Sequence, residues 1–125
     1  TALDVLALWP DRRKVFFCGE MRELGEAAPT AHADLGRRAA DAGVDRLVCV
    51  GRYARTTADA AVEAGLAAER VSAVEDAQTA ADGAIHVVEA GDVILVKGSR
   101  AVGMECIVTA VLGAFGGQTA DSGDG

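Results

Sequence analysis

A short polar segment near the carboxyl end of the chain has the composition of an anion-binding loop. Lys97 and Arg100 flank Gly98 and Ser99 directly after the apolar run 93–96. An ammonium group, a guanidinium fork, a hydroxyl group and the N–H groups of a helix capped by Ser99 are suited to a carboxylate or a phosphate. The alternative interpretation is an ordinary loop whose charges are solvated. These four residues alone are compatible with both.

A second loop, residues 19–25, carries several charges between two glycines. The carboxylates of Glu20 and Glu23 would hold an amine or orient an arginine such as Arg22. Acidic loops are more often simply solvated, because Asp and Glu usually lie on the protein surface. Taken alone, this loop therefore favours a solvated surface segment.

Two further ring side chains follow predicted strands. His32 falls in the first turn of a predicted helix, on the same face as Gly36, where the helix dipole would keep the imidazole neutral and suited to hydrogen bonding. For a single histidine, a structural role is the more common alternative. Tyr53 follows Gly51 after the second apolar run. It would either stack on a ligand or cover the edge of the sheet.

The apolar runs predict the scaffold that positions these loops. Continuous apolar runs indicate strands buried on both faces, as in a parallel sheet. Because each run is followed by a segment with helical character, right-handed crossovers should place the strand-to-helix loops at one edge. We therefore expect an α/β, Rossmann-like fold with a mostly parallel sheet and helices on both faces. The expected strands are 14–19, 46–50, 70–74 and 92–96, and the expected helices are 2–8, 31–42, 57–64, 75–88 and the segment after Ser99.

Two details of these helices follow from local sequence. Thr30 is the expected N-cap of helix 31–42, because its hydroxyl group can accept a bond from a free N–H group of the first turn. In helix 75–88, Ile85 recurs at helical spacing with smaller apolar residues. We therefore expect Ile85 to lie on the buried face.

The composition limits the classes of partner and the organisation of the chain. Its 125 residues include 50% hydrophobic and 4% aromatic residues, and the formal net charge is −7. That charge argues against nucleic acid, which needs a clustered basic surface, and no apolar run reaches the roughly 20 residues of a membrane span. We expect one domain, residues 1–115, followed by a polar, glycine-rich and disordered tail, residues 116–125.

No motif assigns catalysis, a metal or a nucleotide to this chain by itself. The three cysteines lack metal-ligand spacing, and we expect them to be small buried hydrophobes. The sequence has no GxxxxGK[ST] loop, no GxGxxG turn, no HExxH pair and no GxSxG elbow. Because the first helix begins without a visible cap, we expect the chain to be part of a longer, cytoplasmic protein.

Taken together and in this order, three stretches resemble one family. The loop 19–25, then His32 with Gly36, and finally the segment 96–100 followed by Met104 and Glu105 are similar to the C-terminal domain of the Mur ligases, in the branch that adds D-alanyl-D-alanine. The resemblance covers about residues 2–115. Each motif is weak alone, whereas their order, spacing and placement at strand ends are more specific.

The resemblance implies an ATP-dependent amide ligase of peptidoglycan synthesis. In that scheme the carboxylate of a UDP-MurNAc-tripeptide is phosphorylated, and the amine of D-alanyl-D-alanine attacks the acyl phosphate. The C-terminal domain swings over a central ATPase domain and delivers the dipeptide. ATP and Mg²⁺ would be bound mainly outside this chain, which would hold no catalytic residue and no metal of its own.

The resemblance also implies roles for two sets of residues. One set would contact the dipeptide: Lys97, Gly98, Ser99, Arg100, Gly51 and Tyr53. The other would face the nucleotide or the central domain: Glu20, Arg22, Glu23 and His32.

Two departures and two alternatives accompany this interpretation. Glu20 stands where the family usually has Asp, and the central domain with its Walker-type loop is absent, so we expect the isolated chain to be inactive. One alternative is a ligase for another amino acid, although the Lys-Gly-Ser-Arg sequence argues against the diaminopimelate or lysine branch. The other is a non-catalytic binding or interaction module, whose charged loops would not converge on one pocket.

Overall fold

A parallel β-sheet forms the centre of the fold. The structure is a computed structural model that describes residues 2–22, 24–98, 103–115 and 119–121. Within these residues the sheet has five strands in the order β3-β2-β1-β4-β5, and every neighbouring pair is parallel. This confirms the expected α/β, Rossmann-like class. The strands are β1 (Lys14–Cys18), β2 (Arg46–Val50), β3 (Val71–Val74), β4 (Val93–Lys97) and β5 (Thr119–Asp121).

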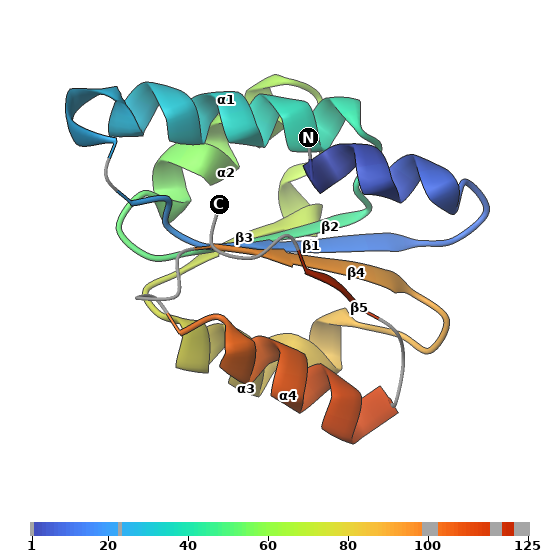
Figure 1. Cartoon of the computed structure of the whole chain (residues 1–125). Helices are drawn as coiled ribbons and strands as arrows, with labels where there is room; N and C mark the ends of the chain where they lie inside the picture. The colour runs from blue at the N-terminus through green and yellow to red at the C-terminus, as the bar shows by residue number, and fades with distance from the viewer. Residues whose placement is uncertain (1, 23, 99–102, 116–118, 122–125) are drawn as a thin grey trace.

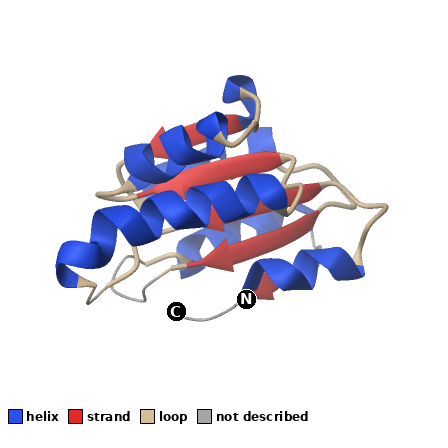
Figure 2. Cartoon of the chain, turned by 90° about the horizontal axis from the view of Figure 1, so that it is seen from above, coloured by secondary structure: helices blue, strands red, loops and turns tan. Residues whose placement is uncertain are grey.

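Helices cover both faces of the sheet, as expected (Figure 1). One face carries η1, α1 and α2, and the other carries α3 and α4. Seen from above, α1 runs along the strands that it covers (Figure 2). The helices are η1 (Ala2–Leu8), η2 (Gly25–Ala27), α1 (Ala28–Asp41), α2 (Ala54–Glu63), η3 (Ala68–Arg70), α3 (Ala77–Val87) and α4 (Glu105–Phe115).

Alternation along the strands divides the core into two layers. In β1, Phe16 and Cys18 pack on the side of α1 and α2, whereas Val15 and Phe17 pack on the side of α3 and α4. Successive side chains of a strand point to opposite faces. A continuous apolar run is therefore needed to fill both layers, and this explains why the strands were predictable.

The start of α1 differs from the prediction. The helix begins at Ala28, and its N-cap is Ala27 without a side-chain hydrogen bond, so Thr30 lies inside the helix. The preceding η2 turn runs directly into α1, because Ala27 and Ala28 at its end already have helical backbone angles. Pro29 occupies the first turn, where its missing N–H group costs nothing. A hydroxyl cap is therefore not required.

Helices α3 and α4 agree with the prediction only in part. Ile85 is 57% exposed, because the buried face of α3 follows its alanines and not the full apolar set. The last helix begins at Glu105, so Met104 and Glu105 lie at its start as expected, whereas Ser99, the expected N-cap, lies outside the described residues.

The sheet also extends into the segment expected to be disordered. Residues Thr119–Asp121 pair with β4 as the parallel edge strand β5. For these three residues the expectation of a disordered tail is wrong, because they complete the hydrogen bonding of the outer edge of β4. The division of the chain at residue 115 stays a prediction.

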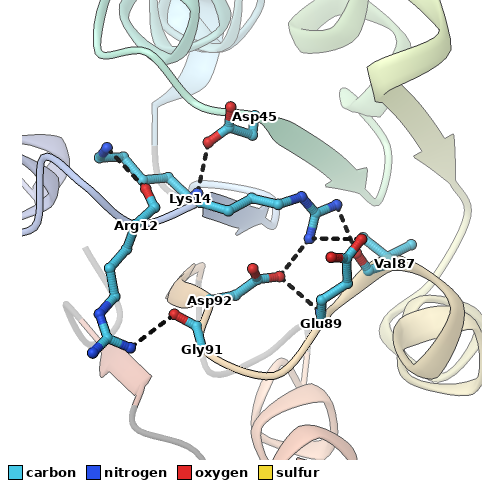
Figure 3. A network of polar contacts seen from close by, with 8 residues as sticks. Arg12, Lys14, Asp45, Val87, Glu89, Gly91 and Asp92 are labelled. Atoms are coloured by element: carbon cyan, nitrogen blue, oxygen red, sulfur yellow. Dashed lines mark hydrogen bonds and ion pairs between the residues drawn. The ribbon is translucent and has the colours of Figure 1, made fainter.

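A polar network closes the edge at which the strands begin (Figure 3). Arg13 donates to the carboxylate of Asp92 and, over 3.1 Å, to the carbonyl oxygen of Val87. Asp92 has a side chain only 3% exposed and also accepts the N–H of Glu89. The backbone N–H of Lys14 donates to a carboxylate oxygen of Asp45 at 2.8 Å. These contacts tie the start of β1 to the starts of β4 and β2.

No helix among the described residues has the length and apolar composition that crossing a membrane requires.

Candidate functional site

The strand order places a topological switch point between the carboxyl ends of β1 and β4. The chain leaves β1 toward α1 on one face and leaves β4 toward α4 on the other. In doubly wound sheets, ligands bind at such a topological switch point. Lys97 is the last residue of β4 and pairs in register with Cys18, so it stands at this point.

The two strand ends are in unusually close contact. The N–H of Gly19 donates to the carbonyl oxygen of Lys97 at 2.6 Å. A Cβ atom placed on Gly98 would lie 3.1 Å from the Cα of Gly19 and 2.9 Å from the Cγ of Met104. Both glycines are buried. The loop after β1, the end of β4 and the start of α4 therefore meet at one packed point.

His32 holds the loop that follows β1. Its Nε2 atom accepts a hydrogen bond from the backbone N–H of Met21 at 3.0 Å, and its Nδ1 atom lies 2.7 Å from the carbonyl oxygen of Ala28. Because Nε2 must accept, the proton belongs on Nδ1, which donates to Ala28. The ring is 2% exposed and stacks on Tyr53, with a distance of 4.5 Å between ring centroids. His32 thus acts as a neutral connector between α1, the loop after β1 and the start of α2.

Charged groups surround this connector at the surface. Glu20 and Arg22 form an ion pair at 3.7 Å, and the guanidinium carbon of Arg52 lies 5.3 Å from the centroid of the Tyr53 ring. Gly51 has φ +101°, and a Cβ atom there would lie 3.4 Å from the Oε1 atom of Glu20. The left-handed backbone accounts for a glycine at this position, and the side chain of Glu20 lies in contact distance of it.

The structure thus brings together residues that the sequence assigned to different ligands. Gly51 and Tyr53 were expected at the dipeptide, and Glu20 and His32 at the nucleotide, yet the four form one cluster beside β1 and β2. We call this group, with Met21, Arg22 and Arg52, the His32 cluster. Lys97 and Gly98 belong to the switch point on the other side of β1. The roles of all these residues toward ligands stay predictions.

A pocket of about 410 Å³ lies beside the switch point and includes Lys97. Its apolar lining comes from α1, η1 and the loop after β1, and its rim carries an ion pair in which the Nε atom of Arg38 lies 2.8 Å from a carboxylate oxygen of Asp34. Within the described part of the chain, the Lys97 ammonium group has no hydrogen bond or ion pair. The residues that line the pocket are Leu3, Met21, Ala31, Asp34, Leu35, Arg38 and Lys97.

Met21 connects the pocket with the His32 cluster. Its backbone N–H binds His32, and its side chain lines the pocket beside Lys97. The sequence-based prediction did not single out Met21, Arg52 or Asp34. The only available signal was that Met21 and Arg52 lie inside loops already under consideration. Glu23, Ser99 and Arg100, which were predicted for the site, lie outside the described residues.

The cysteines contribute packing. All three are free, and Cys18 and Cys49 are buried on neighbouring strands, where they pair in register. The pKa of Cys18 is raised well above its usual value, first by a hydrogen bond with Cys49 and then by burial. A neutral thiol at this position fits the expected role of a small apolar residue. Among the described residues, no group of three or more His, Cys, Asp or Glu side chains is arranged to hold a metal ion.

Comparison with known proteins gives this geometry a family context. Residues 1–100 match the family described as "Mur ligase, glutamate ligase domain". The chain is 31% identical over 111 residues to the UDP-N-acetylmuramoyl-tripeptide–D-alanyl-D-alanine ligase of Synechocystis sp., covering 89% of this chain and 24% of the relative. The ligase of the same name from Mycobacterium leprae is 36% identical over 105 residues, covering 82% of this chain and 20% of the relative.

Solved structures agree with these relatives. MurF from Acinetobacter baumannii superposes with a TM-score of 0.75 at 28% identity, covering 90% of this chain and 24% of that one. MurF ligase from Thermotoga maritima in complex with ADP gives a TM-score of 0.69 at 25% identity, covering 91% and 25%. The chain therefore spans about a quarter of the length of the proteins that it matches. With its first 100 residues matching the family and its relatives agreeing in name and fold, the chain belongs to the Mur ligase family, as its C-terminal domain.

Proposed function

We propose that this chain is the substrate-delivering domain of an ATP-dependent ligase that joins D-alanyl-D-alanine to the UDP-MurNAc-tripeptide in peptidoglycan synthesis. The observation that carries the proposal is the shared name of relatives that align over 82% and 89% of the chain. The site adds chemical support, because a lysine without an ion-pair partner among the described residues stands at the switch point beside a pocket.

The reaction assigns this domain a positioning task. The γ-phosphoryl group of ATP passes to the tripeptide carboxylate, the neutral amine of the dipeptide attacks the acyl carbon, and phosphate leaves as the amide bond forms. A dipeptide that must present its amine needs to be held by its other end. In the proposal, the Lys97 ammonium group pairs with the dipeptide carboxylate, together with Gly98 and, from the sequence, Ser99 and Arg100.

Such positioning has a large energetic effect. Holding two reactants in the right geometry can lower a barrier by about 7–11 kcal/mol at best. A domain without a bond-making residue of its own therefore contributes through geometry. This is consistent with a site made of Lys97, buried glycines and a largely apolar pocket wall.

The His32 cluster is proposed to face the nucleotide or the central ATPase domain. Arg22 and Arg52 are exposed cations at this edge, which suits triphosphate oxygens. Gly51 and Tyr53 belong to the same cluster, and they stay proposed contacts of the dipeptide from the family resemblance. His32 has both ring nitrogens engaged inside the chain, so its contribution is to hold the loop that carries Glu20. ATP and Mg²⁺ are proposed to bind mainly on the central domain, outside this chain, in the cytoplasm.

The convergence of the loops favours a ligase over a non-catalytic module. The fold alone places these loops at one end of the strands, so the support comes from the specific contacts between them. Here Glu20 approaches Gly51, His32 stacks on Tyr53, and Met21 links them to the pocket of Lys97. These contacts support one continuous site.

The test is a kinetic comparison of two lysine variants in a full-length ligase that carries this domain. Lys14 and Lys97 are the only lysines of the chain, and they lie at opposite ends of the strands. Lys14→Ala is therefore a matched control for Lys97→Ala. A charge-assisted hydrogen bond contributes about 1.5–3 kcal/mol, so Lys97→Ala should raise the KM for D-alanyl-D-alanine by roughly 10- to 100-fold. The KM for the tripeptide should change little, and Arg100→Ala should behave like Lys97→Ala.

The outcome that contradicts the proposal is equally specific. Unchanged dipeptide kinetics in Lys97→Ala, or an equal loss in Lys14→Ala, would remove Lys97 from the dipeptide site. The isolated chain should neither hydrolyse ATP nor form the amide bond. Ligation by the isolated chain would show that it needs no central domain.

A further inference from the structure

Gly19 and Gly98 are glycines for a reason of packing and not of backbone angle. Neither lies in the left-handed region, which in this chain is adopted by other glycines such as Gly51. An alanine is therefore allowed at both positions by the backbone. What excludes a methyl group is Met104, with its Sδ 2.9 Å from the Cβ position of Gly19 and its Cγ 2.9 Å from that of Gly98.

The three residues connect elements on opposite faces of the sheet. Met104 belongs to the core layer of α3 and α4. Along β4, Val93 and Leu95 point to the same face as Lys97, and both belong to the layer of η1, α1 and α2. Lys97 follows that alternation and lines the pocket on the α1 side. Met104 thus contacts the end of β4 from the face of α3 and α4, whereas Lys97 extends toward the face of α1.

We infer that Met104, seated on Gly19 and Gly98, is a positioning residue that sets the direction of Lys97 toward the bound substrate. This inference rests on the proposed function and adds a residue that touches no ligand. The hydrogen bond from the N–H of Gly19 to the carbonyl oxygen of Lys97, at 2.6 Å, is the element that Met104 holds in place. A displacement of either glycine moves the backbone from which Lys97 reaches the pocket.

The contacts predict an asymmetry between the two glycines. At Gly19 the three atoms nearest to the added methyl group all belong to the flexible side chain of Met104, at 2.9, 3.1 and 3.3 Å. At Gly98 it also meets the backbone of Gly19, with 3.1 Å to Cα and 3.3 Å to N. Shortening Met104 should therefore relieve Gly19→Ala fully and Gly98→Ala only in part.

The two methionines of the chain serve as NMR probes for this test. Met21 and Met104 are its only methionines, so labelled methionine methyl groups give two NMR signals, one from the pocket and one from the contact with the glycines. Both signals, and the backbone amide signal of Lys97, are followed while D-alanyl-D-alanine is added to the full chain. Gly83→Ala is the matched control, because a Cβ atom there meets nothing within 4 Å.

The expected results form a double-mutant cycle. In the parent chain, the dipeptide shifts the Met21 signal, and Lys97→Ala abolishes that shift. Gly98→Ala shifts the Met104 signal and weakens dipeptide binding by about tenfold, since a misplacement of about 1 Å can cost a positioned group up to about 100-fold. Gly19→Ala has a smaller effect, which Met104→Ala removes. Met104→Val, which lacks Sδ and Cε but keeps Cγ atoms, should relieve Gly19→Ala in part. It is the second variant where Met104→Ala is too unstable, as judged by its unfolding curve.

Two different failures are distinguishable. If D-alanyl-D-alanine shifts neither signal of the parent chain, the proposed dipeptide site is wrong, whatever the glycine variants do. If the parent binds and Lys97→Ala does not, but Gly98→Ala shifts the Met104 signal and still binds like the parent, the positioning role is wrong. An equal weakening in Gly83→Ala would also overturn it, because that variant does not touch the contact.

Discussion

Replacing His32 by phenylalanine tests how the loop after β1 is held. Phenylalanine keeps a flat ring to stack on Tyr53, but it removes the acceptor for the N–H of Met21 and the donor for the carbonyl oxygen of Ala28. Stacking is thus retained while hydrogen bonding is lost. The substitution separates the two contributions of a ring that is only 2% exposed.

The expected magnitude follows from the two groups left behind. A typical hydrogen bond contributes about 0.5–1.5 kcal/mol, and a buried group without a partner costs about 1–3 kcal/mol. Met21 is only half-buried, so water can reach its N–H group in part. Ala28 lies in the first turn of α1, where its carbonyl oxygen can still accept within the helix. We therefore expect a loss of about 1–2 kcal/mol in the free energy of unfolding, in the middle of these ranges.

The assay combines denaturant unfolding with amide hydrogen exchange. The loss should be local, so the Met21 amide should exchange about tenfold faster or more, because each 1.4 kcal/mol corresponds to a factor of ten. The amides of β4 should change only with global stability. His86→Phe is the matched control, since His86 is the only other histidine and is exposed on α3. If the Met21 amide stays as protected in His32→Phe as in the parent, His32 does not hold this loop.

Three further predictions address the scaffold. Gly36→Ala should destabilise the fold by about 1–3 kcal/mol or more through overpacking, because a Cβ atom there would lie 2.1 Å from a carbonyl oxygen of α2. Gly83→Ala should be neutral or stabilising, and denaturant unfolding of both variants checks these expectations. The backbone N–H of Thr79, and then its hydroxyl group, lower the pKa of the N-cap Asp76. The stabilisation by Asp76 should therefore be present above the unfolded pKa of about 3.9 and lost as the pH falls through the lower folded pKa. The free energies of unfolding of Asp76→Ala and the parent, measured across that range, should converge at low pH. Burial, and then a neighbouring carboxylate, raise the pKa of the half-buried Cys106, so at pH 8 it should react with maleimide more slowly than a free thiol, while the two buried cysteines react only on unfolding, as mass spectrometry of the labelled chain would report.

The scaffold was predictable where one sequence feature determines one structural feature. Strands such as β1 and β4 need apolar residues for both core layers, so their runs are continuous and easy to recognise. Helix starts depend on more than the nearest hydroxyl residue. At α1 the η2 turn enters directly, and Thr30 is not used as a cap. At α3 the small alanines pack on the sheet and Ile85 points to solvent, although both have apolar character.

The site was predictable only as a set of loops. The order of the loops at one edge follows from the alternation of strands and helices, but the contacts between them depend on strand order. Because β1 lies between β2 and β4, its loop meets Gly51 on one side and Gly98 on the other. Chain order alone therefore could not show which of these residues lie together and which ligand each would face. The stacking of His32 on Tyr53 joins residues 21 positions apart, and no local pattern marks it.

The two edges of the sheet differ in how their charges are used, and this difference is itself an argument for function. At the end where the strands begin, Arg13, Asp92 and Asp45 satisfy one another or the backbone. At the opposite edge, Lys97 lies beside a pocket without an ion-pair partner among the described residues. Cationic side chains that only stabilise a fold are normally paired or fully solvated. Lys97 is half-buried and lines a pocket without such a partner among the described residues, and a bound carboxylate would supply one.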